Sequence, residues 1–160
     1  MSAAALADTS GSGALGSTAV GAPPPAPAKT LKVLLYSDDA QVRESLRLAL
    51  GTRPDPDLPA LALEEFATAA ALIERMDASV KGVRADLLIL DGEAVPVGGM
   101  GLARQLKDEI YQCPPLLVLT GRAQDGWLAT WARADAVVAH PIDPVRLAEV
   151  AVGLLRPRVG

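Results

Sequence analysis

Asp86-Leu87-Leu88-Ile89-Leu90-Asp91 is the stretch that decides the fold, because its inner residues are all aliphatic and a carboxylate closes each end. A strand that is apolar at every position has both faces covered, which is typical of a parallel sheet between two layers of helices. The stretch therefore predicts a buried strand. The Gly-rich segment from Gly92 to Gly101 predicts a loop after it.

Shorter apolar runs on both sides of this stretch predict four further strands. They cover residues 32–36, 61–66, 116–120 and 136–139. The segments between strands carry apolar residues at helical spacing. The residues that mark these predicted helices are Val42, Leu46, Ala49 and Leu50; Ala69, Leu72, Ile73 and Met76; Leu102, Leu106 and Ile110; and Trp127, Leu128 and Trp131. A last helix begins with Asp143 as N-cap and Pro144 at its first position. Its predicted buried residues are Leu147, Val150, Ala151 and Leu154.

Strands that alternate with helices predict the α/β class, with one five-stranded, doubly wound parallel sheet. In such folds the ligand site lies at the carboxyl ends of the strands. The residues that stand at these ends are polar: Ser37-Asp38-Asp39, Asp91, Thr120 and His140. Because these strand ends meet at one edge of the sheet, their convergence predicts the functional site.

The residue types at this edge indicate the chemistry. The carboxylates of Asp38 and Asp91 can share a hard cation such as Mg²⁺, which takes oxygen ligands and keeps several waters. An aspartate such as Asp91 can also accept a phosphoryl group, whose charge then needs a metal, a hydroxyl donor and a cation. Thr120 offers the hydroxyl, and His140 stands where the cation is needed.

The region from Leu31 to Arg156 resembles the receiver domain of two-component response regulators, on the order and spacing of these strand-end residues. The resemblance implies a (βα)5, flavodoxin- or CheY-like fold with strand order 2-1-3-4-5. It also implies a role for each matching position: Asp91 as the phosphoacceptor, Asp38 and the backbone carbonyl of Glu93 as Mg²⁺ ligands, Thr120 as the switch hydroxyl, and His140 in place of the phosphate-binding lysine.

Several positions depart from the receiver pattern. Ser37 replaces the first of the two acids after the first strand, and Val137 stands where a switching aromatic residue is frequent. Histidine at position 140 has a shorter reach than lysine and is a weaker point charge near pH 7. Pro141 matches a proline that follows a cis peptide bond in the family. The phosphorylation site is therefore interpreted as partly degenerate.

Composition excludes several classes of protein. Lys and Arg number 15 against 19 Asp and Glu, and this net charge of −4 disfavours nucleic-acid binding. The single cysteine and single histidine rule out an internal disulfide and a structural zinc site. No apolar run approaches the roughly 18 residues that a membrane span needs, and no basic residue precedes Lys29. We therefore expect a cytoplasmic protein without direct membrane insertion.

The N-terminal segment differs from the rest of the chain. Ala, Gly, Ser, Thr and Pro fill 24 of the first 30 positions, so residues 1–30 are predicted to form a disordered tail. The Gly11-Ser12-Gly13-Ala14-Leu15-Gly16 stretch fits the dinucleotide-binding pattern, but no strand precedes it, so the match is interpreted as accidental. The receiver-like domain is expected over residues 31–156, with 157–160 as the C-terminal end.

Trp127 and Trp131 are two of only five aromatic residues and lie four positions apart on one predicted helix. Core packing against the sheet is one interpretation. The other is a protein-contact surface, because exposed tryptophan is a frequent anchor of interfaces. Both interpretations remain open from the sequence.

Three functions compete at this point. The first is a receiver-like signalling module without an output domain, which acts through protein contacts and is addressed by a histidine kinase. The second is a phosphorylation-independent pseudo-receiver that serves as an accessory subunit. For that role the resemblance to orphan receivers of high-GC bacteria implies the NADH–quinone oxidoreductase as a partner, with a peripheral position on a membrane complex. The third, a phosphatase with Asp91 as nucleophile, would need an acid two residues later, and Glu93 is a poor substitute for aspartate there. We expect no substrate turnover.

Overall fold

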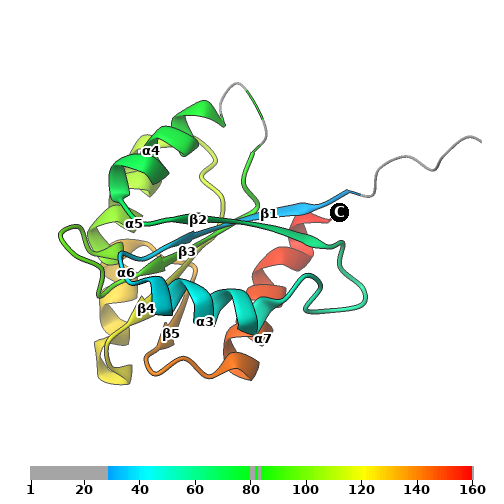
Figure 1. The fold of residues 1–160 in the computed structure, drawn as a ribbon. Helices are drawn as coiled ribbons and strands as arrows, with labels where there is room; N and C mark the ends of the chain where they lie inside the picture. The colour runs from blue at the N-terminus through cyan, green and yellow to red at the C-terminus, as the bar shows by residue number, and fades with distance from the viewer. Residues whose placement is uncertain (1–28, 80–81, 83, 160) are drawn as a thin grey trace, which may run out of the picture.

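The computed structural model describes residues 29–79, 82 and 84–159. Of the predicted tail, residues 1–28 lie outside the described residues. The described part forms a five-stranded parallel sheet with the order β2-β1-β3-β4-β5 (Figure 1), which confirms the predicted fold class and strand order. The strands are β1 (Leu31–Tyr36), β2 (Leu61–Phe66), β3 (Leu87–Asp91), β4 (Leu116–Thr120) and β5 (Ala136–Ala139).

Helices cover both faces of this sheet. On one face lie α3 (Ala40–Leu50) and α7 (Pro144–Leu155), and on the other lie α4 (Ala69–Ala78), α5 (Gly99–Glu109) and α6 (Leu128–Ala132) (Figure 1). Two short 3₁₀ segments, η2 (Ala123–Trp127) and η3 (Arg156–Arg158), precede α6 and follow α7. No helix in the described ranges is long and apolar enough to cross a membrane.

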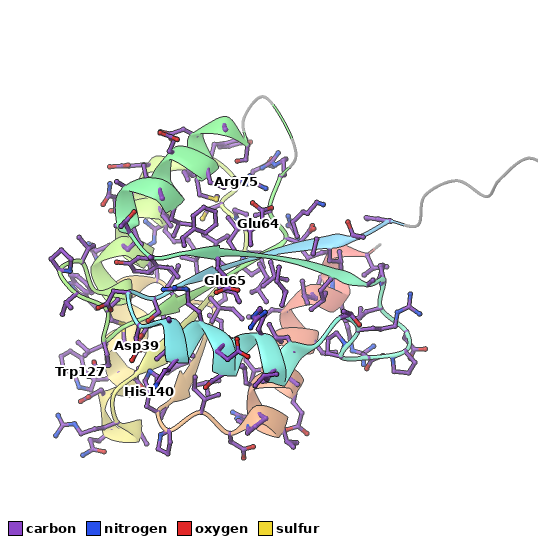
Figure 2. All side chains as sticks on the ribbon, in the orientation of Figure 1. Asp39, Glu64, Glu65, Arg75, Trp127 and His140 are labelled. Carbon is purple, nitrogen blue, oxygen red and sulfur yellow. The ribbon has the colours of Figure 1, made fainter. Side chains whose placement is uncertain are left out.

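The apolar strands separate two hydrophobic cores. Every residue of β3 and β4 is buried, as the sequence predicts for strands between two helical layers. Alternate residues serve opposite cores: Ile89 packs with the α3–α7 side, whereas Leu88 and Leu90 pack with the α4–α5–α6 side. On the edge strand β2, Glu65 lies toward α3 and Glu64 toward Arg75 of α4 (Figure 2), so the same alternation places two carboxylates in opposite layers.

Helix starts are set by polar caps. Asp39 accepts a hydrogen bond from the backbone N–H of Gln41 at the start of α3, at 2.8 Å. The Oδ1 of Asp143 accepts from the N–H groups of Val145 and Arg146, with Pro144 in the first turn of α7 as predicted. These caps satisfy N–H groups that have no partner within the helix.

One predicted boundary is wrong, and one predicted helix is shorter than its neighbours. The Gly-rich segment 92–101 is not a loop throughout, because α5 begins at Gly99. The predicted fourth helix is present as the five residues of α6, and Trp127 lies just before it at the end of the 3₁₀ segment η2. Glycine and tryptophan in this segment give weak helical propensity, which fits the short, broken course.

The buried face of α7 is also shifted from the prediction. Leu147 and Ala151 are buried as predicted, but Val152 and Leu155 complete the buried set, while Val150 and Leu154 are only partly buried. Both sets of positions satisfy helical spacing, so the sequence pattern could not choose between two faces that differ by a small rotation.

Gly99 sets how closely α5 approaches the sheet. A Cβ at this position would lie 2.7 Å from the backbone C and O of Asp91, whereas a Cβ at Gly101 in the same helix would meet nothing within 4 Å. The absence of a side chain at Gly99 therefore lets the first turn of α5 pack directly on the backbone that carries Asp91.

The two glycines form a matched pair of test sites. Gly99→Ala is expected to lower the free energy of unfolding by about 1–3 kcal/mol, because the backbone must move apart. Gly101→Ala is expected to raise it by about 0.5–1 kcal/mol, because alanine favours an open helical position. Urea unfolding of both variants tests this, and equal effects would contradict the packing argument.

Candidate functional site

Asp91 is the centre of the site. It is the last residue of β3 and is 2% exposed. Its Oδ2 accepts a hydrogen bond from the Ser37 hydroxyl at 2.8 Å, and its Oδ1 accepts one from the backbone N–H of Glu93 at 2.9 Å. Nε2 of His140 lies 3.2 Å from the same Oδ1. Both oxygens of this buried carboxylate are therefore engaged by groups of the chain itself.

Ser37 occupies the position where the receiver pattern has its first acid. The residue is fully buried, directly after β1. While its hydroxyl donates to Asp91, the same oxygen accepts from the N–H of Asp39 at 3.0 Å. A neutral donor thus stands where a third negative charge would otherwise lie, which lowers the charge repulsion around Asp91.

Arg43 is a supporting residue to which the sequence analysis assigned no role. Its guanidinium donates to the Ser37 carbonyl at 2.6 Å and to Oε1 of Glu65 at 3.2 Å. This pair of bonds ties the segment after β1 to the neighbouring strand β2. Its position six residues after Ser37, in the segment predicted as the first helix, did not by itself indicate a contact with Ser37.

His140 reaches the site from the end of β5. Its backbone N–H donates to the Thr120 carbonyl at 2.7 Å, and its side chain is 23% exposed. The His140–Pro141 peptide bond is cis, as the resemblance implied, and Val95–Pro96 is cis as well. Asp39 and His140 lie at the same end of the sheet (Figure 2) and line one hollow of about 320 Å³.

Asp38 is exposed, and its carboxylate accepts from the N–H of Val95 in the loop after β3, at 3.1 Å. This bond places the Asp38 carboxylate over the loop that follows Asp91. Nearby, the Tyr36 hydroxyl donates to the Val97 carbonyl at 2.6 Å. Burial raises the pKa of Tyr36, and the negative charges of Asp38 and Asp91 raise it further.

Thr120 does not join the hydrogen bonds around Asp91. It is 1% exposed, and its Oγ1 has no hydrogen-bond partner among the residues that the structure describes. The sheet register explains this: Asp91 is paired with Leu119, so Thr120 is one residue further and faces the opposite side of the sheet. The structure therefore brings together Ser37, Asp91 and His140, and leaves the Thr120 hydroxyl free.

The Glu93 side chain lies at the end of β4. A Cβ at Gly121 would come within 2.6 Å of Oε1 of Glu93, so glycine at 121 gives the carboxylate its space. Glu93 is exposed and adds a negative charge beside the Thr120–Gly121 step. The sequence suggested a metal ligand in the Glu93 backbone carbonyl and only a poor substitute for an aspartate acid in its side chain.

The donor set fits a hard cation. Asp38, Asp91 and the Glu93 carbonyl supply only oxygen atoms, at the ends of the adjacent strands β1 and β3, and oxygen is the ligand that Mg²⁺ prefers. Within the described ranges, no group of three or more His, Cys, Asp or Glu side chains converges on one point. A cation here would therefore retain several water ligands.

Both tryptophans lie on the surface. Trp127 in η2 is 70% exposed and Trp131 in α6 is 49% exposed, so the core-packing interpretation is wrong for both. The Arg104 guanidinium of α5 lies 5.0 Å from the centre of the Trp131 ring and donates to its carbonyl at 2.7 Å. Figure 2 shows Trp127 on the same side of the molecule as His140, further from the sheet.

Comparison with known proteins identifies the family. No protein-family model matches the chain. Two curated relatives, each an uncharacterized response regulatory protein from a different strain of Mycobacterium tuberculosis, are 55% identical over 126 residues, which cover 79% of this chain and 92% of theirs. At this identity and coverage, the chain belongs to the response regulatory proteins.

Solved structures agree on the fold. The chemotaxis response regulator CheY4 of Vibrio cholerae matches with a TM-score of 0.65 and 18% identity, over 79% of this chain and all (100%) of that chain. A CheY-like receiver domain protein from Methanospirillum hungatei matches with a TM-score of 0.62 and 20% identity, over 82% and 98%. The described sheet and helices are therefore a CheY-like receiver fold.

Replacing Ser37 tests the electrostatics of the site. Ser37→Asp puts a second carboxylate against Asp91, so without divalent cations it is expected to lower the thermal unfolding temperature. MgCl₂ should reverse the loss, because a cation that binds only the folded state stabilises it.

The matched control is Ser37→Ala, which leaves an Asp91 oxygen and the Asp39 N–H without this partner. We expect it to cost about 1–3 kcal/mol and to leave the response to MgCl₂ as in the wild type. The measurement is the thermal unfolding temperature of the wild type, Ser37→Asp and Ser37→Ala, each with and without MgCl₂. Failure of MgCl₂ to stabilise any of the three proteins would argue against a cation site at Asp38 and Asp91.

Proposed function

We propose that this receiver-like protein transmits a signal through protein contacts and that Asp91 is its phosphoacceptor. The observation that carries the proposal is the buried Asp91 carboxylate, held at the end of β3 by Ser37, the Glu93 N–H and His140. These groups fix the orientation of the carboxylate. The protein is not proposed to turn over a substrate.

In the proposed step, an oxygen of Asp91 attacks the phosphorus of a donor such as acetyl phosphate or a kinase phosphohistidine. The P–O bond to acetate, or the P–N bond to the histidine, breaks, and that group leaves with the bonding electrons. Ser37 and His140 lie within hydrogen-bond reach of the carboxylate, where they can donate to the phosphoryl oxygens. Mg²⁺ held by Asp38, Asp91 and the Glu93 carbonyl would supply neutralisation of the phosphoryl charge.

A specific observation also favours the alternative, a phosphorylation-independent accessory subunit. Both Asp91 oxygens already have partners within the chain, and Thr120 does not face them. The fold therefore needs neither metal nor phosphate to satisfy this buried carboxylate. The NADH–quinone oxidoreductase as host remains a prediction from sequence resemblance.

The partner-contact surface in this proposal contains Trp127 and Trp131. Exposed tryptophan next to arginine is the composition that dominates binding energy in many interfaces. Arg104 is part of this surface because its guanidinium lies over the Trp131 ring. The nearby cations Arg122 and Arg133 are paired with Asp125 and Asp108.

Intact-protein mass after incubation with MgCl₂ and acetyl phosphate tests the phosphoacceptor. We expect one phosphoryl adduct on the wild type and none on Asp91→Asn. His140→Lys should increase the rate of adduct formation, because lysine is the stronger point charge.

If folded wild type forms no adduct while His140→Lys does, the accessory-subunit alternative is favoured. If neither forms one, Asp91 is not a phosphoacceptor.

Truncation of the two tryptophans tests the contact surface. Because both side chains are exposed, Trp127→Ala and Trp131→Ala are each expected to change the free energy of unfolding by less than about 0.5 kcal/mol. The same variants should form the Asp91 adduct normally and lose proteins that co-purify with the wild-type chain from its native host. Retention of every co-purifying protein by the double variant would place the contact surface elsewhere.

A further inference from the structure

A groove between α3 and α7 takes no part in the site around Asp91. The two helices pack in the same hydrophobic core, and a hollow of about 530 Å³ lies between them and the loop of residues 51–60. The residues that give this α3–α7 groove its lining are mostly small and apolar: Ala49, Pro54, Pro144, Ala148, Val152 and Gly153.

The charges and the open space of the groove favour an uncharged occupant. At one end, Arg156 forms an ion pair with Asp55 at 2.7 Å, so these two charges neutralise each other. Glu149 also lines the groove and is exposed to water. At Gly153, a Cβ would meet nothing within 4 Å, so no described side chain fills the space over this part of α7.

The loop of residues 51–60 connects the groove to the start of β1. The Leu31 N–H donates to the Ala60 carbonyl at 3.0 Å, and the Leu61 N–H donates to the Thr52 carbonyl at 2.7 Å. The same loop carries Pro54, which lines the groove. The first residues of β1 therefore lie against the loop that forms one end of the groove.

The segment after α7 lies at the start of β1 as well. The Asp86 carboxylate accepts from the Lys32 N–H at 2.8 Å and lies 3.7 Å from Nε of Arg158 in η3. Figure 1 shows the end of α7 close to the start of β1. The chain that precedes Lys29 therefore joins the fold near the end of the groove that Arg156 lines.

The sequence that precedes this point has the composition and length to fill the groove. Within residues 1–28, Asp8 is the only charged side chain, and the stretch nearest the fold is Ala22-Pro23-Pro24-Pro25-Ala26-Pro27. Such a stretch favours the polyproline II helix, which rises about 3.1 Å per residue, so six residues span roughly 19 Å. The 12 residues of α7 span about 18 Å at 1.5 Å per residue.

A polyproline II segment loses little on docking. It has no internal hydrogen bonds and keeps its backbone in water, so it can lie in an open groove without unsatisfied polar groups. The proline rings fix φ in advance, which lowers the entropy cost of binding. Because Pro27 is only four residues from Leu31, docking is intramolecular and benefits from a high effective concentration.

We propose that Ala22–Pro27 dock along α7 in the α3–α7 groove, with proline rings and alanine methyl groups against Ala148, Val152 and Gly153. The occupant is thus the chain's own N-terminal segment. This inference goes beyond the proposed function and does not require phosphorylation of Asp91.

The test is ¹⁵N relaxation of the full-length chain, read at the amides of Ala22 and Ala26. We expect backbone order parameters near 0.85 at both, roughly the value of rigid backbone. Gly153→Trp fills the groove at a position where a side chain has space. In this variant both order parameters should fall below about 0.6, the range of flexible backbone.

The matched control is Gly101→Trp. It adds the same side chain on α5, on the other face of the sheet, where a Cβ also meets nothing within 4 Å. The order parameters of Ala22 and Ala26 should remain as in the wild type.

A second variant changes only the docking segment and leaves the folded part intact. Replacement of Pro23, Pro24 and Pro25 by glycine removes the preformed helix and should also release the segment. The amides of Val152 and Gly153 should then shift, because they lose the docked segment.

Order parameters below about 0.6 in the wild type overturn the inference. It is also overturned if the segment stays ordered in Gly153→Trp, because the contact then lies elsewhere. Docking within one chain does not depend on protein concentration. A loss of order on dilution would mean that the groove takes the N-terminal segment of a second copy, which rejects the intramolecular contact.

Discussion

The burial of β3 on both faces is the constraint on which the rest of the structure depends. A strand between two helical layers must be apolar throughout, and Leu87 to Leu90 meet that condition with no exposed surface. The next residue, Asp91, is only 2% exposed, so its carboxylate is buried away from water at the end of an apolar strand. Burying such a charge is unfavourable unless hydrogen bonds replace its hydration. The surrounding residues supply those bonds.

The groups that donate hydrogen bonds to Asp91 distinguish this site from the usual receiver pattern. Three acids around one point would repel each other and need a cation, whereas a serine hydroxyl stabilises Asp91 without one. Ser37 provides that hydroxyl, and Arg43 holds the Ser37 carbonyl in turn. The arrangement satisfies both oxygens of the Asp91 carboxylate with groups of the chain itself.

The sequence predicted the features that depend on local pattern. Apolar runs located the five strands, and Asp143 with Pro144 located the start of α7. Features that depend on the register between strands could not be predicted from the sequence. Thr120 ends its strand as predicted, but the one-residue offset from Leu119, the partner of Asp91, turns its hydroxyl to the other face. The start of α5 at Gly99 depends on close contact with the Asp91 backbone, which propensity alone does not show.

His140, at the end of β5, contacts both Asp91 and the backbone of Thr120, whose side chains face opposite sides of the sheet. The His140 side chain lies 3.2 Å from Asp91, while its backbone N–H donates to the Thr120 carbonyl at 2.7 Å. One residue, His140, therefore contacts the Asp91 carboxylate with its side chain and the backbone of β4 with its N–H.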